Sequence, residues 1–261
     1  MNLSLIGKNA IVCGSSQGIG RAIAEELALL GARCILLARN PDRLRDVVSS
    51  LDTSAGQEHS FRAADFTNPD AIKTVVETIA AEMPVHILVN NTGGPAAGPI
   101  VDATTDQFLA TFQQHLLVNH ILTTAVLPGM KREGFGRIIN VISTSVKIPL
   151  KNLGVSNTIR GAVASWAKTM ANELGSFGIT VNNVLPGATK TGRLDAVLTS
   201  TAQKKGQTVD EASKDMMAEI PAKRFGEAGE IAAVAAFLAS PAAAYVNGVS
   251  IPVDGGRTGS I

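Results

Sequence analysis

Short apolar runs alternate with amphipathic segments along most of the chain. The runs at residues 10–13 and 34–38, for example, are too short for helices and contain no polar position. A continuous apolar run of this length indicates a strand buried on both faces, whereas apolar residues three or four positions apart indicate a helix. The predicted strands are residues 10–13, 34–38, 60–64, 87–89, 137–142, 180–185 and 249–253. The predicted helices are residues 18–30, 41–51, 69–83, 105 to about 128, 155–174 and 227–238.

This alternation predicts a parallel sheet, because strands joined through helices run in the same direction and are covered on both faces. We therefore expect one doubly wound Rossmann-type α/β domain over residues 1–261, with a seven-stranded parallel sheet. A polar segment, residues 192–223, interrupts the alternation. Since it follows the sixth strand, we expect it beyond the carboxyl ends of the strands, as a lid or substrate loop.

The composition favours a buried core and gives no sign of a nucleic-acid or membrane partner. The chain is 45% hydrophobic and 17% charged, which excludes disorder, and its net charge of +1 creates no attraction to polyanions. The N-terminus lacks a signal-peptide pattern, and no apolar run is long enough to span a bilayer. We expect a cytoplasmic protein without a bound metal, in which Cys13 and Cys34 are buried, reduced thiols.

A glycine-rich turn joins the first predicted strand to the first predicted helix. Residues 14–20 read Gly-Ser-Ser-Gln-Gly-Ile-Gly. The start of a helix has unpaired N–H groups and a partial positive charge, and a pyrophosphate satisfies both where glycines let the backbone come close. The spacing differs from the G-x-G-x-x-G fingerprint, so the turn alone is equally compatible with an ordinary loop that binds no nucleotide. Arg39 ends the second strand, where a βαβ unit places its ribose-reading residue, and the two features together predict a dinucleotide site.

Arg39 also predicts which dinucleotide is bound. An acidic residue at this position would accept hydrogen bonds from the ribose 2′-OH and repel a 2′-phosphate. Ala38 and Arg39 supply no acid, and a guanidinium can pair with the phosphate. We therefore expect NADP(H) in preference to NAD(H). The alternative is that Arg39 stacks on the adenine or faces solvent.

Several further motifs follow the glycine turn in an order that resembles the classical short-chain dehydrogenase/reductase family, close to its 3-oxoacyl-(acyl-carrier-protein) reductases. They include Asn-Asn-Thr-Gly at 90–93, Pro-Gly at 186–187 and Val-Asp-Gly-Gly at 253–256, and the resemblance covers nearly the whole chain. It implies a homotetrameric nicotinamide-dependent oxidoreductase that reduces a ketone, such as a 3-oxoacyl thioester. The implied cofactor-binding residues are Gly14, Ser15, Ser16, Gln17, Gly18, Ile19, Gly20, Arg39, Asp65, Phe66, Asn91, Thr92, Gly93, Arg160, Pro186, Gly187, Thr189 and Thr191.

The resemblance places Asn119 and Ser143 in the catalytic tetrad, and the chain departs from the family at the other two positions. Where the family has a tyrosine and then a lysine four residues on, this chain has Ser156 and Arg160. A serine hydroxyl is shorter and far less acidic than a phenol, and arginine stays protonated, so Ser156 is not expected to replace the acid. Arg160 can still hold ribose hydroxyls and supply positive charge. Any carbonyl reduction is then expected to use water or Lys147, whose alternative role is a solvated side chain.

Two classes of function remain open at this point. One is a reductase with an altered proton path, and the other is an NADP-binding module or sensor with impaired or no carbonyl reduction. His115 and His120 are expected to be structural or solvated rather than proton relays, and Tyr245, the only tyrosine, is expected to pack or cap near the C-terminus. The apolar residues of helix 155–174, with Trp166 among them, either form a subunit interface or pack on the sheet.

Overall fold

The structure is a computed structural model that describes residues 1–260. Within them, seven parallel strands form one sheet in the order β3-β2-β1-β4-β5-β6-β7. The predicted single doubly wound domain is therefore confirmed, and no strand boundary moves by more than one residue. The strands are β1 (Asn9–Cys13), β2 (Arg33–Ala38), β3 (Ser60–Ala63), β4 (Ile87–Asn90), β5 (Gly136–Val141), β6 (Ile179–Pro186) and β7 (Ser250–Val253).

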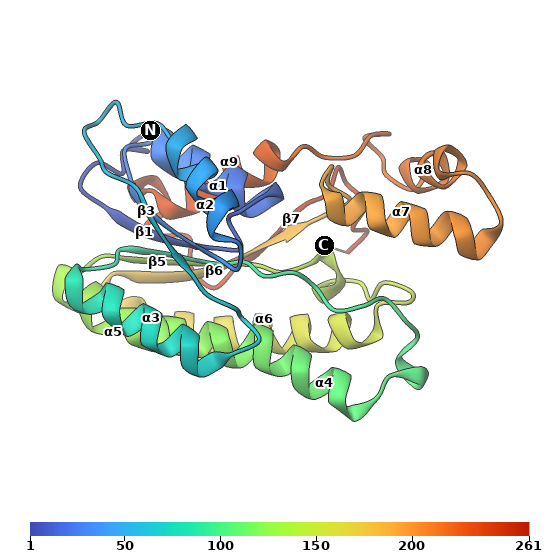
Figure 1. Cartoon of the computed structure of the whole chain (residues 1–261), viewed down its shortest axis with the longest axis horizontal. Helices are drawn as coiled ribbons and strands as arrows, with labels where there is room; N and C mark the ends of the chain where they lie inside the picture. The colour runs from blue at the N-terminus through green and yellow to red at the C-terminus, as the bar shows by residue number, and fades with distance from the viewer. Residues whose placement is uncertain (261) are drawn as a thin grey trace.

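Helices cover both faces of the sheet (Figure 1). On one face lie α1 (Gly18–Leu29), α2 (Pro41–Ser50) and α9 (Ala228–Ala239), and on the other lie α3 (Pro69–Glu82), α4 (Thr105–Phe112), α5 (Val118–Glu133) and α6 (Gly154–Leu174). Successive residues of a strand pack into the apolar cores on opposite faces of the sheet. Val12 packs on the side of α1, α2 and α9, and Ile11 packs on the side of α3, α5 and α6. This is why the strands contain apolar residues at successive positions.

The ends of α2 and α3 follow the local sequence rules. Asn40 and Asn68 accept hydrogen bonds from the N–H groups of Arg43 and Ala71, at 3.0 and 3.1 Å. Each asparagine is followed by a proline at the first helical position, where a missing N–H costs nothing.

The long helix expected at 105 to about 128 is different in the structure. A π-helical turn at Gln113–Leu117 separates α4 from α5, and α5 continues through Pro128 to Glu133. Pro128 is tolerated because it lies on the exposed side of α5, where water can satisfy the carbonyl that loses its partner. The helix ends at Gly134, which has the left-handed φ of 58°.

The polar segment 192–223 contains two helices that the hydrophobic pattern did not predict. They are α7 (Gly192–Lys205) and α8 (Val209–Ala218), which lie beyond the edge of the sheet in Figure 1. Leu194 and Leu198 of α7 and Ala212 of α8 form a small separate cluster with Phe225, which follows the segment. The segment therefore packs on apolar contacts that also involve the chain just before and just after it.

The remaining expectations about burial are partly confirmed. Cys13 and Cys34 are buried free thiols, and burial raises the pKa of each to about 12. In helix α6, Val163 and Ala167 are buried inside the protomer, which favours packing on the sheet over a subunit interface. None of the helices described in residues 1–260 has both the length and the apolar character needed to cross a membrane.

Candidate functional site

The glycine turn 14–20 connects β1 to α1 at the carboxyl edge of the sheet. Gly14 and Gly18 have left-handed φ values of 60° and 57°, which glycine adopts without strain. The side chain of Gln17, at the N-cap of α1, accepts a hydrogen bond from Arg43 Nη1 at 2.8 Å. Because Gln17 turns toward Arg43, the first N–H groups of α1 are free for an anion.

Asn91 braces this turn from the loop that follows β4. Its Nδ2 atom donates to the carbonyls of Cys13 and Gly14, at 3.2 and 3.3 Å. A Cβ on Gly14 would lie 2.5 Å from the Asn91 carbonyl oxygen, and one on Gly20 would lie 2.6 Å from Asn91 Nδ2. Any side chain at Gly14 or Gly20 would therefore push the turn and the loop apart.

Arg39 and Asp65 follow β2 and β3 at the same edge, and both are exposed. The Thr67 N–H donates to Asp65 Oδ1 at 3.0 Å and lowers the pKa of that carboxyl, and Arg39 adds a smaller attraction. Phe66 is buried beside them. The structure thus brings Arg39 and Asp65 near each other, one and two strands away from the glycine turn.

Ser143 lies just beyond β5, and its hydroxyl oxygen accepts a hydrogen bond from the Ser145 N–H at 3.1 Å. The hydroxyl hydrogen of Ser143 is then free to donate to another group. Lys147 caps the short helix that Ser143 begins, and its side chain is exposed. In residues 1–260 the structure shows no hydrogen bond between Lys147 Nζ and Ser143.

A chain of buried amides supports the strands below Ser143, and sequence reasoning missed it. Asn90 Nδ2 donates to Asn140 Oδ1, and Asn140 Nδ2 donates to Asn183 Oδ1, both at 2.9 Å. Asn183 Nδ2 then donates to Ser250 Oγ at 3.0 Å. The sequence signal was one asparagine at the end of β4, one near the end of β5 and one within β6, which the strand register places side by side.

Asn119 lies in the first turn of α5, directly after the π-helical turn, and it is buried. A π turn adds one residue to the helical repeat and so changes which side chains face inward. His115, within that turn, is also buried, whereas His120 is exposed and accepts a hydrogen bond from Trp166 Nε1 at 3.4 Å. The expectation of a structural or solvated role therefore fits both histidines.

Arg160 is buried in α6, and its guanidinium holds two backbone carbonyls. Nη1 donates to Val141 at 3.0 Å, and Nη2 donates to Thr92 at 3.4 Å. Burial lowers its pKa to about 10, with a further contribution from the charge of Arg193. Because Val141 ends β5 and Thr92 follows β4, Arg160 ties the end of β5, two residues before Ser143, to the loop after β4.

Ser156 is half-buried and one helical turn before Arg160. The described residues show no hydrogen bond between its hydroxyl and Ser143, although both lie at the same edge of the sheet. The loops themselves are joined by a bridge between Gly98 and Leu153. Ser143, Ser156 and Arg160 thus lie in the loop after β5 and in α6, at the same edge of the sheet.

The segment after β6 closes the site opposite the glycine turn. Gly187 N–H donates to the Val253 carbonyl at 3.0 Å, and a Cβ on Gly187 would lie 2.6 Å from Asp254 Cβ. Thr191 is the N-cap of α7, and its Cγ2 atom is 3.3 Å from where a Cβ on Gly18 would stand. The segment after β6 therefore contacts the glycine turn at Thr191 and Gly18.

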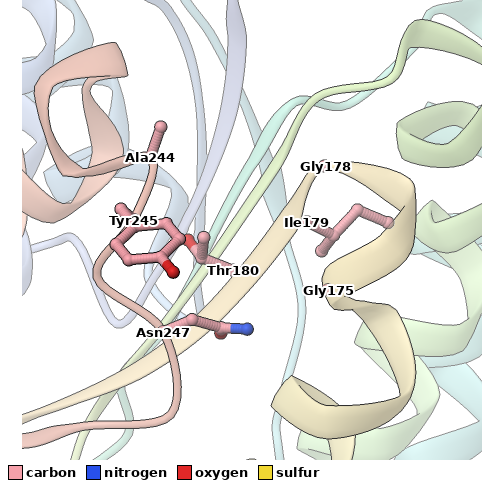
Figure 2. A pocket seen from close by; sticks show the side chains of 7 residues that line it. All are labelled: Gly175, Gly178, Ile179, Thr180, Ala244, Tyr245 and Asn247. Atoms are coloured by element: carbon pink, nitrogen blue, oxygen red, sulfur yellow. The ribbon is translucent and has the colours of Figure 1, made fainter.

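A separate hollow of about 340 Å³ lies where β6 begins, at the amino edge of the sheet (Figure 2). Tyr245 stands at this hollow and is fully exposed, so the expectation that it packs or caps is wrong. The segment after α9 runs over the surface there, and the ring therefore faces solvent. Because the hollow and Ser143 occupy opposite ends of the strands, Tyr245 lies outside the candidate site.

Comparison with known proteins gives one consistent result. The family model described as "Enoyl-(Acyl carrier protein) reductase" matches residues 14–258. The 3-oxoacyl-[acyl-carrier-protein] reductase FabG of Vibrio cholerae is 36% identical over 257 residues, which cover 97% of this chain and 98% of the relative. L-sorbose reductase from Gluconobacter frateurii, solved with NADPH and L-sorbose, has a TM-score of 0.93 and 31% identity, with both chains fully covered. YwfH, an NADPH dependent reductase involved in bacilysin biosynthesis, has a TM-score of 0.92 and 30% identity over 97% of this chain and 99% of YwfH.

Proposed function

Because the chain belongs to the short-chain dehydrogenase/reductase family, we propose that it reduces a ketone to an alcohol with NADPH, by a proton path that does not use Ser156. The observation that carries the proposal is the convergence of the glycine turn, the loop after β4 and the loop of Ser143, which Asn91 and Arg160 tie together. NADP(H) is the cofactor, as in the similar structures that hold NADP or NADPH.

The residues at this edge fit that cofactor. The free N–H groups of α1 suit its pyrophosphate, and exposed Arg39 suits its 2′-phosphate. Close packing at Gly14 and Gly20 excludes any side chain that would block the turn. When bound, NADPH supplies a hydride to the carbonyl carbon of the substrate.

Ser143 and Asn119 would bind the carbonyl oxygen as negative charge develops on it. Ser143 is suited to donate, because its oxygen already accepts from Ser145 and its hydrogen is free. Donors that are fixed before the reaction stabilise such charge without reorganising. Arg160 is anchored to Val141 and Thr92, so its part is to hold the loops and to add positive charge beneath them.

The proton for the new alcohol comes from water at Ser143 or from Lys147. Ser143 is only half-buried, and Lys147 is exposed, so solvent reaches both. Ser156 is a poor acid and Arg160 does not release its proton at neutral pH. Since a well-placed general acid contributes about 10²–10⁴-fold, we expect a slow reductase on simple ketones.

The test is to incubate the purified protein with NADPH and a panel of ketones that includes β-ketoacyl thioesters, while nicotinamide absorbance is followed. We expect NADPH consumption that Ser143→Ala removes, with unchanged NADPH binding by fluorescence. Ser165→Ala, at an exposed serine of α6, is the matched control. Tight NADPH binding without reduction of any ketone would instead identify the binding module or sensor.

A further inference from the structure

Two guanidinium groups, from two different helices, hold the loop that follows β4. Arg160 of α6 donates to the Thr92 carbonyl at 3.4 Å, and Arg193 of α7 donates to the Pro95 carbonyl at 3.0 Å. These contacts fall within four consecutive residues, and the charge of Arg193 contributes to the lowered pKa of Arg160. Two positive charges therefore lie close together at this edge of the site.

These charges have no acidic partner in the described part of the chain. Neither Arg160 nor Arg193 forms an ion pair with a carboxylate of residues 1–260. The loops after β4 and β5, residues 91–104 and 142–153, contain one acidic residue, Asp102, against Lys147 and Lys151. With Arg160 and Arg193, these two loops therefore carry a local excess of positive charge.

The position of Arg193 also does not stabilise its own helix. It is the second residue of α7, where the helix carries a partial positive charge and acidic residues are favoured. Its side chain is exposed, and the bond to Pro95 uses one of its five N–H donors. The remaining fork matches the two oxygens of a carboxylate.

We propose that the ketone substrate carries a carboxylate, which Arg193 binds while Arg160 adds a second positive charge beneath the loop. This inference rests on the proposed function and names the substrate class, an oxo acid. The phosphates of the cofactor are the other anions that reach this edge. Their expected binding groups are the glycine turn and Arg39, and Thr191, two residues before Arg193, lies against Gly18 of that turn. The experiment therefore includes an outcome that assigns Arg193 to a cofactor phosphate.

The experiment compares 4-oxopentanoate with its methyl ester, because the two differ in the carboxylate charge. Binding to the protein–NADP⁺ complex is measured by calorimetry, and NADPH-dependent turnover is measured in parallel. We expect the wild type to bind the acid about tenfold more tightly than the ester. Arg193→Gln should remove this preference and leave NADPH affinity and ester binding unchanged. Arg132→Gln, an exposed arginine in the last turn of α5 at the opposite edge, should keep it.

Three results would overturn the inference. The first is equal binding, or no binding at millimolar concentration, of the acid and the ester to the wild-type complex. The second is an unchanged preference in Arg193→Gln. The third is weaker NADPH binding in Arg193→Gln with the same acid-to-ester ratio, which would assign Arg193 to a cofactor phosphate. The proposed function fails by a different result, namely that NADPH does not bind or that no ketone oxidises it.

Discussion

His115 Nδ1 lies 2.7 Å from the Thr92 hydroxyl oxygen, which joins the π-helical turn to the loop after β4. The Nε2 atom of the same ring is buried without a partner among residues 1–260. Burial first, and then the charge of Arg160, lower the pKa of His115 to about 2, against a smaller opposing backbone hydrogen bond with Gly93. His115 is therefore neutral at physiological pH and braces the loop that Arg160 holds.

This state of His115 predicts a pH dependence of stability. The unfolded chain binds a proton near pH 6.5 that the folded chain does not bind until about pH 2, so the free energy of unfolding falls as the pH drops below 6.5. In urea titrations, His115→Gln should reduce that fall by about 1 kcal/mol per pH unit between pH 6 and pH 5. His120→Gln, at an exposed histidine in α5, is measured in parallel as the control. Equal slopes in His115→Gln and wild type would contradict a buried, neutral His115.

Arg160 should matter for stability as well as for the site. Its planar fork reaches the carbonyls of both Val141 and Thr92, whereas a lysine ammonium has no such fork. Arg160→Lys should therefore lower the free energy of unfolding by about 1–3 kcal/mol, because one buried carbonyl loses its donor. Urea denaturation measures this change, with exposed Lys168→Arg as the control. A variant as stable as the wild type would show that these two bonds contribute nothing net.

Arg39 should decide between the two cofactors. Arg39→Asp would repel the 2′-phosphate and offer a carboxylate to a free 2′-OH. We expect NADPH to bind at least about tenfold more weakly to this variant, while NADH binds more tightly. Fluorescence titration of both cofactors checks the prediction, and Arg45→Asp in α2 controls for the charge change. Unaltered NADPH affinity in Arg39→Asp would mean that Arg39 faces solvent.

A homotetramer is our proposal for the assembly. Val163 and Ala167 of α6 are buried within the protomer, so they cannot form the interface. Exposed apolar side chains remain on α4 and the π-helical turn, among them Leu109, Phe112 and Leu117. Light scattering at micromolar concentration should give about four times the 27.0 kDa chain mass, and Leu109→Glu should reduce it. A monomeric wild type would refute the proposal.

Much of the sheet could be predicted from sequence, because buried parallel strands leave continuous apolar runs between helices. The glycine turn could also be predicted, since its glycine spacing and the helix that follows it are features of one short stretch of sequence. The π-helical turn was not, because it has no residue-type signature and depends on how α4 and α5 pack. Helices α7 and α8 were not predicted, because their many polar residues obscure the helical pattern of apolar positions. Thr208 and Glu211 nevertheless form a capping box at the start of α8.

The candidate site was only partly predictable for a related reason. Asn119 and Ser143 could be located through motifs, but the contact between His115 and Thr92 joins residues 23 positions apart. The meeting of Arg160 and Arg193 on one loop depends on the position of α7, which local sequence does not determine. Side chains that meet only in the folded chain leave no periodic signal.

The most direct test of the account is the turnover of Ser156→Ala with NADPH on whichever ketone the wild type reduces. We assign the proton to water or Lys147, so this variant should retain a rate within a few-fold of wild type. Ser143→Ala should abolish the rate, and Lys147→Ala separates the two proton sources. The contradicting result is a fast wild type whose turnover Ser156→Ala removes without weakening NADPH binding, because Ser156 would then be the catalytic acid.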